Sequence, residues 1–107
     1  MEPERLKEYD IFVPLCYNDG TSVEAKKFQD IQSLLLERFG GVTFFPQPNT
    51  GLWTMSGVTY RDEIVIYHVL AADASDVRAF FVNFKEKLKS DFEQEDVLII
   101  ERDVTAI

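Results

Sequence analysis

The segment Tyr60–Ala72, with the sequence YRDEIVIYHVLAA, constrains the fold of this chain more than any other stretch. From Ile64 to Val69 it is apolar on both faces of an extended chain. A strand that is buried on one side only alternates apolar and polar residues more cleanly. The segment is therefore predicted to be a strand with apolar side chains on both faces of a sheet.

Five further segments have the period of a strand or of a helix. Strand patterns cover Tyr9–Tyr17, Val42–Phe45 and Asp96–Val104, and helical spacing of apolar residues covers Ser22–Phe39 and Asp76–Phe92. The order strand, helix, strand, strand, helix, strand predicts an α+β ferredoxin-like βαββαβ sandwich, with one four-stranded antiparallel sheet and two helices on one face. Right-handed crossovers would place the first and third strands in the middle of that sheet.

Turn and capping residues set the expected boundaries. Thr21 and Glu24 have the spacing of a capping box, which predicts a helix that starts at Ser22. Gly40 follows the helix where a left-handed glycine commonly ends one. Pro14 has no N–H to donate, so the first strand needs a bulge or a local break there. The face on which Cys16 lies therefore stays open.

The segment from residue 46 to residue 57 combines prolines and glycines with the single tryptophan of the chain. Pro46, Pro48 and Gly51 are poor strand residues and predict a hairpin tip or a disordered loop. Leu52–Met55 are expected to return to an extended conformation at the end of this loop.

Length and charge exclude several classes of protein. A chain of 107 residues is predicted to form a single domain, residues 1–107, with residues 1–8 as a flexible N-terminal segment. Its formal net charge of −8 argues against nucleic acid and against an anionic membrane as partners. One cysteine and one histidine cannot supply a disulfide or a Cys/His metal quartet, and no metal or cofactor is predicted. Without a signal-peptide pattern or a long apolar run, a cytoplasmic location is expected.

The predicted architecture leaves one face of the sheet open. Phe12 and some of the aliphatic residues in Ile64–Val69 and Val97–Ile100 should lie on that face. An exposed apolar patch usually marks a partner surface or a ligand groove. By analogy with the behaviour of this fold, we expect a homodimer formed through the sheet face, and a small apolar ligand as a further partner.

Four short motifs resemble those of a known family. NDG lies at Asn18–Gly20, FGGVT at Phe39–Thr43, GLW at Gly51–Trp53 and QEDV at Gln94–Val97. Together they are similar to the FGG(L/V)T, GxW and QExV motifs of an uncharacterised family of small bacterial ferredoxin-like domains, a domain of unknown function. The resemblance spans about residues 17–100. It implies a ferredoxin-like fold and no established activity.

Trp53 is the first candidate for ligand binding, together with Tyr60 and Arg61 nearby in the sequence. An indole at the root of a loop can form the wall of a ligand pocket or stack on a cation. The structural alternative is that Trp53 closes one end of the core or of a dimer interface.

His68, Tyr67 and Cys16 are the candidates for catalysis. An imidazole can act as a general acid or base near neutral pH, and a thiol can act as a nucleophile beside a base. The structural alternatives are a hydrogen-bonded sheet histidine and a packed small residue. The carboxylates at residues 62–63 and 91–96 lack the spacing of metal ligands and are interpreted as solvated charge.

Three hypotheses for function result. The leading one is a non-enzymatic, homodimeric domain that binds a ligand or partner with the open sheet face and residues 46–57. The alternative is a cofactor-free enzyme of the dimeric α/β-barrel kind, a monooxygenase or isomerase, with a pocket near His68, Tyr67 and Trp53. The third is RNA binding, because RRM domains share the element order, but the negative charge makes it the weakest.

Overall fold

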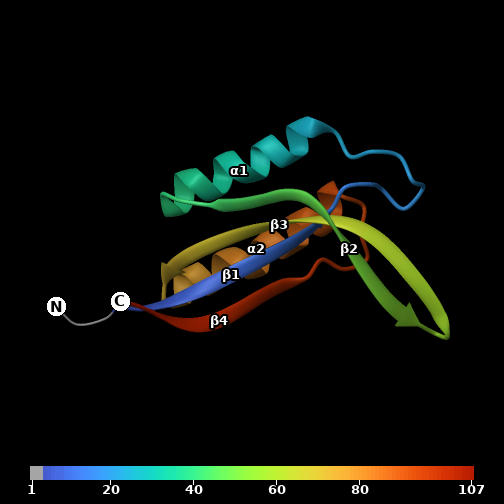
Figure 1. Ribbon diagram of the computed structural model, residues 1–107. Coiled ribbons are helices and arrows are strands. Elements are labelled where there is room, and N and C mark those ends of the chain that lie inside the picture. Colours follow the sequence, from blue (N-terminus) through green and yellow to red (C-terminus); the bar gives the residue numbers. More distant parts are fainter. Residues whose placement is uncertain (1–3) are drawn as a thin grey trace.

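The computed structural model describes residues 4–107, except for the side chains of residues 47 and 48. Its four strands form one sheet in the order β2-β3-β1-β4, in which all neighbouring strands are antiparallel. The expected α+β class and the central position of β1 and β3 are confirmed, and the arrangement is compatible with a ferredoxin-like fold. The elements, shown in Figure 1, are β1 (Glu4–Pro14), α1 (Ala25–Phe39), β2 (Thr43–Met55), β3 (Val58–Ala72), α2 (Ser75–Asp91) and β4 (Ile99–Ala106).

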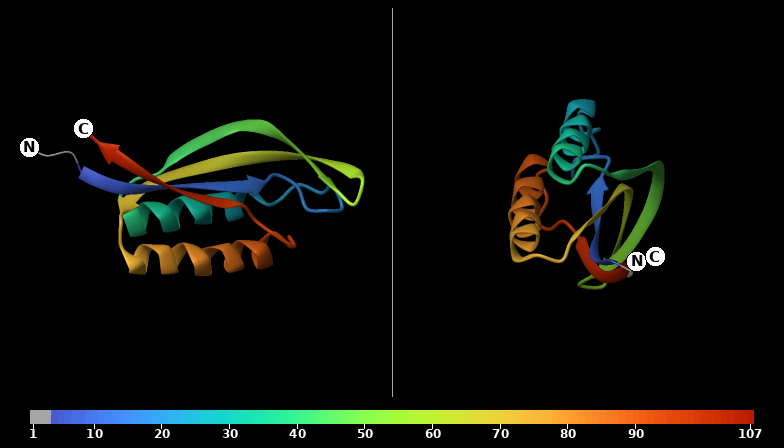
Figure 2. Two further views of the ribbon diagram at one scale, coloured as in Figure 1. Left: turned by 90° about the horizontal axis from the view of Figure 1, so that it is seen from below. Right: turned by 90° about the vertical axis from the view of Figure 1, so that its left-hand side faces the viewer.

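Both helices lie on one face of the sheet, as the sequence predicts, and the other face carries no helix (Figure 2). The core lies between these two layers. Alternate residues of β1 and β3 point into it and meet the apolar stripes of α1 and α2. Its largest fully buried side chains are Tyr67, Phe92, Ile11, Leu35 and Leu88. Within the described part of the chain, neither helix combines the length and the apolar character needed to cross a membrane.

β1 begins earlier than the sequence predicts. The expectation of a flexible segment over residues 1–8 is wrong for residues 4–8, which belong to the strand. Glu4 pairs with Ala106 of β4, and Leu6 pairs with both β4 and β3. Because β4 satisfies its backbone groups on one side, and β3 does so on the other side from Leu6 onward, this charged stretch is extended without an alternating apolar pattern. Residues 1–3 lie outside the described residues.

The capping-box prediction for the first helix is also wrong. α1 starts at Ala25, and its N-cap residue Glu24 makes no side-chain capping hydrogen bond. The Thr21 hydroxyl instead donates to Asp19 at 2.6 Å, and Glu24 accepts a hydrogen bond from the Tyr17 hydroxyl. The polar side chains that suggested a cap therefore stabilise the turn before the helix, which delays the helix start.

The remaining helix and strand ends shift by a few residues. Gly40 ends α1 as expected, with φ of +77° and its N–H donating to the Leu36 carbonyl at 2.8 Å. α2 begins and ends one residue before its predicted range, and β4 begins at Ile99 instead of Asp96. The residues before Ile99 form a loop that lines the site described below.

The prediction of a loop at residues 46–51 is wrong, because β2 continues through it to Met55. The pairing of β2 with β3 shifts register between Phe45 and Asn49, and the prolines lie in this irregular stretch. Beyond it the ladder resumes and ends at a two-residue turn, Ser56 and Gly57, which both have positive φ. We call residues 49–64 the distal hairpin; it projects beyond the helices at one end of the molecule (Figure 1).

Candidate functional site

A cavity of about 820 Å³ lies on the open side of the sheet, between the distal hairpin and the loop that precedes β4. We call it the hairpin groove. One wall comes from the hairpin, the opposite wall from residues 94–98, and the end of β1 lies between them. The lining residues are Phe12, Pro14, Asn18, Gly51, Trp53, Met55, Tyr60, Asp62, Ile64 and residues 94–98.

The hairpin wall is built from alternate residues of the two paired strands. Trp53 pairs with Tyr60, and Gly51 pairs with Asp62, so all four residues lie on one face of the hairpin. The rings of Trp53 and Tyr60 stack at a centroid distance of 5.6 Å and an interplanar angle of 18°. Each of these two residues is 42% exposed. The groove therefore offers a flat, preformed aromatic surface to a ligand.

The opposite wall is attached to the core at two points. Val97 is buried, and the Phe12 N–H donates to the Leu98 carbonyl at 3.0 Å. Asp96 is engaged as well, because it forms an ion pair with Lys85 and accepts a hydrogen bond from the Val97 N–H. These contacts place Glu95 at the groove without using its carboxylate.

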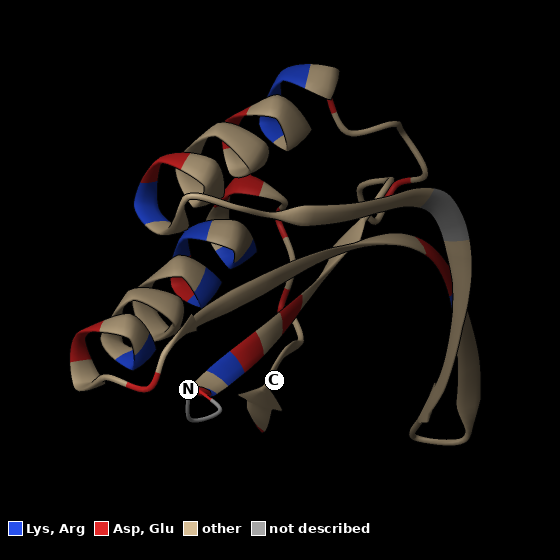
Figure 3. Ribbon diagram, turned by 60° about the vertical axis from the view of Figure 1, so that its left-hand side comes forward, with Lys and Arg blue, Asp and Glu red and all other residues tan. Residues whose placement is uncertain are grey.

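Two carboxylates in the groove have no partner among the described residues. The side chains of Asp62 and Glu95 form no hydrogen bond or ion pair within that part of the chain, and burial raises the pKa of Asp62. Residues 49–60 carry no charge, and Figure 3 shows the charged positions concentrated on the helices and the body of the sheet. The groove thus combines apolar surface with uncompensated negative charge, which attracts cations.

Arg61 does not belong to this site. It lies on the opposite face of the hairpin, where its guanidinium forms an ion pair with Glu63 at 3.3 Å. Successive strand residues point to opposite faces, so Tyr60 and Arg61 cannot line the same groove. Of the three residues expected to bind a ligand, the structure places Trp53 and Tyr60 together.

His68 lies on the open face but in the body of the sheet, eight residues along β3 from Tyr60. Its Nδ1 is 2.7 Å from Asp10, and Nε2 is 3.8 Å from Glu8. Arg102 contacts both carboxylates, at 2.6 Å from Asp10 and 3.5 Å from Glu8. Burial would raise the pKa of Asp10, but the hydrogen bonds from His68 and Arg102 outweigh it and lower that pKa. His68 is therefore a hydrogen-bonded sheet histidine.

Tyr67 and Cys16 are separated from His68 and from each other. The Tyr67 ring is fully buried on the helix side, where it stacks on Phe44 and its hydroxyl donates to the Phe28 carbonyl at 3.4 Å. Cys16 is exposed beyond the end of β1, where it forms an isolated bridge with Ser22. The structure does not bring these catalytic candidates together, nor does it place His68 and Tyr67 beside Trp53.

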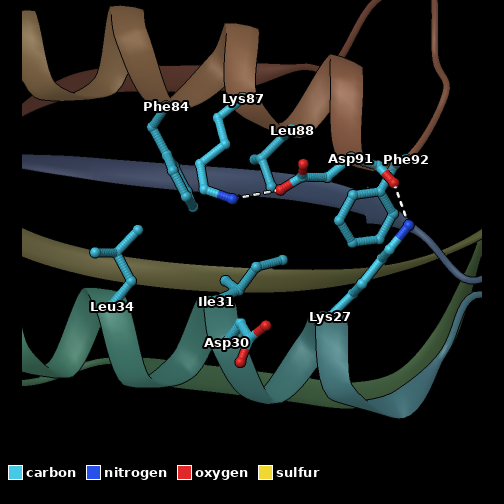
Figure 4. A pocket seen from close by; sticks show the side chains of 9 residues that line it. All are labelled: Lys27, Asp30, Ile31, Leu34, Phe84, Lys87, Leu88, Asp91 and Phe92. Carbon is cyan, nitrogen blue, oxygen red and sulfur yellow. Dashed lines mark hydrogen bonds and ion pairs between the residues drawn. The ribbon is translucent and has the colours of Figure 1, made fainter.

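A second, smaller cavity of about 480 Å³ separates α1 from α2 on the outer side of the helix layer. Figure 4 shows its apolar floor, formed by residues such as Ile31 and Phe84, and charged side chains at its rim. The rim charges are paired: Lys87 with Asp91, and Asp30 with Lys26. Within residues 4–107, no group of three or more His, Cys, Asp or Glu side chains could hold a metal ion.

No family model and no curated protein matches the sequence. Among solved structures, the chain is similar to a phage SAM lyase in complex with S-methyl-5'-thioadenosine, with 17% identity, a TM-score of 0.65, and coverage of 94% of this chain and 88% of that chain. The apo state of a phage SAM lyase gives 18% identity and a TM-score of 0.69, over 96% and 86% of the two chains. These similarities show a shared fold. The resemblance to the uncharacterised bacterial family stays a prediction.

Sequence reasoning missed the carboxylates of this site. From the sequence, Asp62 and Glu95 are both interpreted as solvated charge, because the carboxylates of residues 62–63 and 91–96 lack the spacing of metal ligands. They line the same groove only because of the antiparallel register of the hairpin and the path of the loop before β4. The alternation of Gly51, Trp53 and Met55 was the available signal for a common face.

Proposed function

We propose that this protein is a small ligand-binding domain, and that the hairpin groove binds an organic cation that carries a flat ring. The observation that carries the proposal is the stacked pair Trp53–Tyr60 beside two carboxylates, Asp62 and Glu95, that have no partner among the described residues. The sequence suggests a small apolar ligand. The two carboxylates indicate that the ligand also carries a positive charge.

Each part of such a ligand has a physical counterpart in the groove. A planar ring stacks on the exposed indole or phenol, and a cation over an aromatic face gains about 0.5–2 kcal/mol. The carboxylate of Asp62 loses part of its hydration in the groove, and a bound cation would compensate for that loss. A neutral apolar ligand would use the rings alone and should bind more weakly.

The solved structures of similar fold support this class of ligand. A phage SAM lyase acts on SAM, which combines an adenine ring with a positively charged sulfonium group, and one of the structures holds S-methyl-5'-thioadenosine. S-methyl-5'-thioadenosine shares the methylthioadenosine part of SAM but lacks its sulfonium charge and its aminocarboxypropyl chain. The two molecules are therefore a charged and an uncharged probe for the groove.

Intrinsic fluorescence tests the proposal directly, because Trp53 is the only tryptophan of the chain. Titration with SAM should change the Trp53 emission, and calorimetry should give a lower Kd for SAM than for S-methyl-5'-thioadenosine. Asp62→Asn should raise the Kd for SAM by about tenfold, equivalent to about 1.4 kcal/mol. The same substitution should leave the Kd for S-methyl-5'-thioadenosine nearly unchanged. Arg61→Gln, on the opposite face of the hairpin, is the matched control. Absence of binding for both probes at millimolar concentration would reject the proposal.

Enzymatic conversion of the same ligand is the second candidate function. The observation that favours it is the raised pKa of Asp62, because a carboxyl group with a raised pKa can exchange protons nearer neutral pH. Chromatography of SAM after incubation with the protein tests this candidate. Turnover by the wild type that Asp62→Asn abolishes would support it, whereas SAM that stays intact would leave binding as the function.

Self-association through the open sheet face is also part of the proposal. An apolar row crosses that face, with Phe45, Ile66 and Phe12 on neighbouring strands. Phe45 is 47% exposed. Light scattering should show a dimer that Phe45→Asp dissociates, and a strict monomer at high micromolar concentration would contradict this part. The cytoplasmic location expected from the sequence stays a prediction.

A further inference from the structure

We infer that Lys27 is a positioning residue for the hairpin groove, because it holds the end of α2 from which the groove wall at residues 94–98 departs. The inference rests on the proposed function for its binding measurement. Its structural part is independent of any ligand.

The wall of the groove is a direct continuation of α2. The helix ends at Asp91, the buried Phe92 follows, and Glu93 has a φ of +53°. Residues other than glycine adopt this left-handed conformation at an energetic cost. The Gln94 N–H then donates to the Lys89 carbonyl at 2.9 Å, and the chain enters the wall. The position of Glu95 thus depends on how this turn is held.

Side chains from the other half of the molecule hold the turn. The Lys27 ammonium group of α1 donates to the Asp91 carbonyl at 2.5 Å, as Figure 4 shows, and the Asn18 side chain donates to the Glu93 carbonyl at 3.3 Å. A cation at the C-terminal end of a helix also interacts favourably with the helix dipole. Lys27 therefore contributes both a hydrogen bond and a charge at the last turn of α2.

Lys27 is itself fixed in place. Its Nζ is 2.6 Å from the Tyr17 hydroxyl and 3.6 Å from the Glu24 carboxylate. The hydrogen bond to Tyr17 and the charge of Glu24 raise the pKa of Lys27, so the ammonium group is charged at neutral pH. Because a cavity separates the two helices here, Lys27 spans the gap between α1 and the end of α2.

Loss of the Lys27 ammonium group should loosen the groove wall without creating a cavity in the core. Asp96 and Val97 still hold the chain after Glu95, but the turn before it would be held less firmly. Glu95 has no ion pair of its own among the described residues, so its position would become less fixed. The stacked rings of Trp53 and Tyr60 lie on the other wall and would stay in place. Binding of a charged ligand should therefore suffer more than binding of its neutral counterpart.

The experiment compares Lys27→Met with Lys26→Met, whose parent residue pairs with Asp30 on the surface of the same helix. Lys27→Met should raise the Kd for SAM by about tenfold, the loss expected for a charged hydrogen bond, with a change below about threefold for S-methyl-5'-thioadenosine. Hydrogen exchange at the Gln94 amide should accelerate at least about tenfold, while the Gly40 amide at the far end of α1 should not change. Lys27→Arg should restore both properties.

The possible outcomes distinguish the role of Lys27 from the proposed binding function. Equal weakening of both probes, or unchanged exchange at Gln94, would overturn the role of Lys27. If the wild type binds neither probe, the proposed function fails, and hydrogen exchange alone still decides the role of Lys27. Should Lys27→Met fail to fold, Tyr17→Phe removes the hydroxyl that contacts Lys27 and should produce the same selectivity change at a smaller size.

Discussion

The body of the sheet and the distal hairpin use the same two strands in different ways. In the body, β3 buries Val65, Tyr67 and Val69 beneath the helices, and the carboxylates on the open face are paired with Arg102 and His68. In the distal hairpin, Trp53 and Tyr60 stay exposed and Asp62 has no partner among the described residues. Stability therefore resides in the body, and the hairpin, which no helix covers, is available for binding. The predictions below test this division.

The largest expected effect is in the body. Leu88 is 1% exposed in the core, and Leu88→Ala should lower the free energy of unfolding by about 2–5 kcal/mol, because it removes buried apolar atoms and leaves a cavity. Leu52 is 67% exposed on the hairpin, and Leu52→Ala should change stability by about 0.5 kcal/mol or less. Urea denaturation measures both. A similar loss for the two variants would remove the distinction between body and hairpin.

The next effect concerns binding in the hairpin. Tyr60→Ala removes the ring that stacks on Trp53 and should weaken the binding of SAM by about 1–2 kcal/mol. The free energy of unfolding should change little. Calorimetry and a thermal melt on the same sample measure the two quantities. Leu52→Ala, on the other face of the hairpin, is the matched control for binding. A loss of stability without a loss of affinity would assign Tyr60 to structure.

A smaller expected effect on stability concerns Asp10, one of the paired charges on the open face of the body. Asp10 has a lowered pKa in the folded state, relative to 3.8 for the unfolded chain, so its ionised form stabilises the protein above that pH. Asp10→Asn should cost about 1–2 kcal/mol at neutral pH. This difference should shrink as the pH falls through the folded pKa, since wild-type Asp10 then becomes protonated. Urea denaturation at several pH values tests the sign, and a difference that grows in acid would contradict it.

The smallest expected effect is on stability and concerns Asp62 in the hairpin. Its dependence on pH has the opposite sign to that of Asp10. Asp62 has a raised pKa, so ionised Asp62 costs stability above its folded pKa, and the cost disappears as the pH falls. Asp62→Asn should therefore be at least as stable as the wild type at neutral pH, with a gain of about 0.5 kcal/mol or less. A clear destabilisation at neutral pH would indicate that Asp62 has a structural partner.

The sequence predicted the body well because its patterns are local. The apolar spacing of Ile31 and Leu35 in one helix, and of Phe81, Phe84 and Leu88 in the other, matches the buried faces. The apolar pattern of Ile64–Val69 correctly indicated a strand, and the rule of right-handed crossovers correctly placed this strand in the middle of the sheet. In each case, burial depends on a period that a short stretch of sequence displays.

The hairpin and the groove were predicted poorly because they depend on pairing between distant residues. Pro46 and Gly51 suggested a loop, yet the register shift accommodates them inside a long strand. Arg61 was grouped with Tyr60 by proximity in sequence, although the pleat places them on opposite faces. Glu95 joins Asp62 only in the folded chain. Trp53 was singled out as a candidate because the only indole of the chain is chemically distinctive whatever its register.

The irregular stretch of β2 has a consequence for the behaviour of the protein in a crowded solution. β2 is an edge strand, and an exposed edge with apolar side chains invites pairing with other chains. Pro46 and Pro48 carry no N–H, so this part of β2 has fewer donors with which a further strand could pair. The prolines that suggest a loop in the sequence therefore also make this part of the edge strand a poorer template for aggregation.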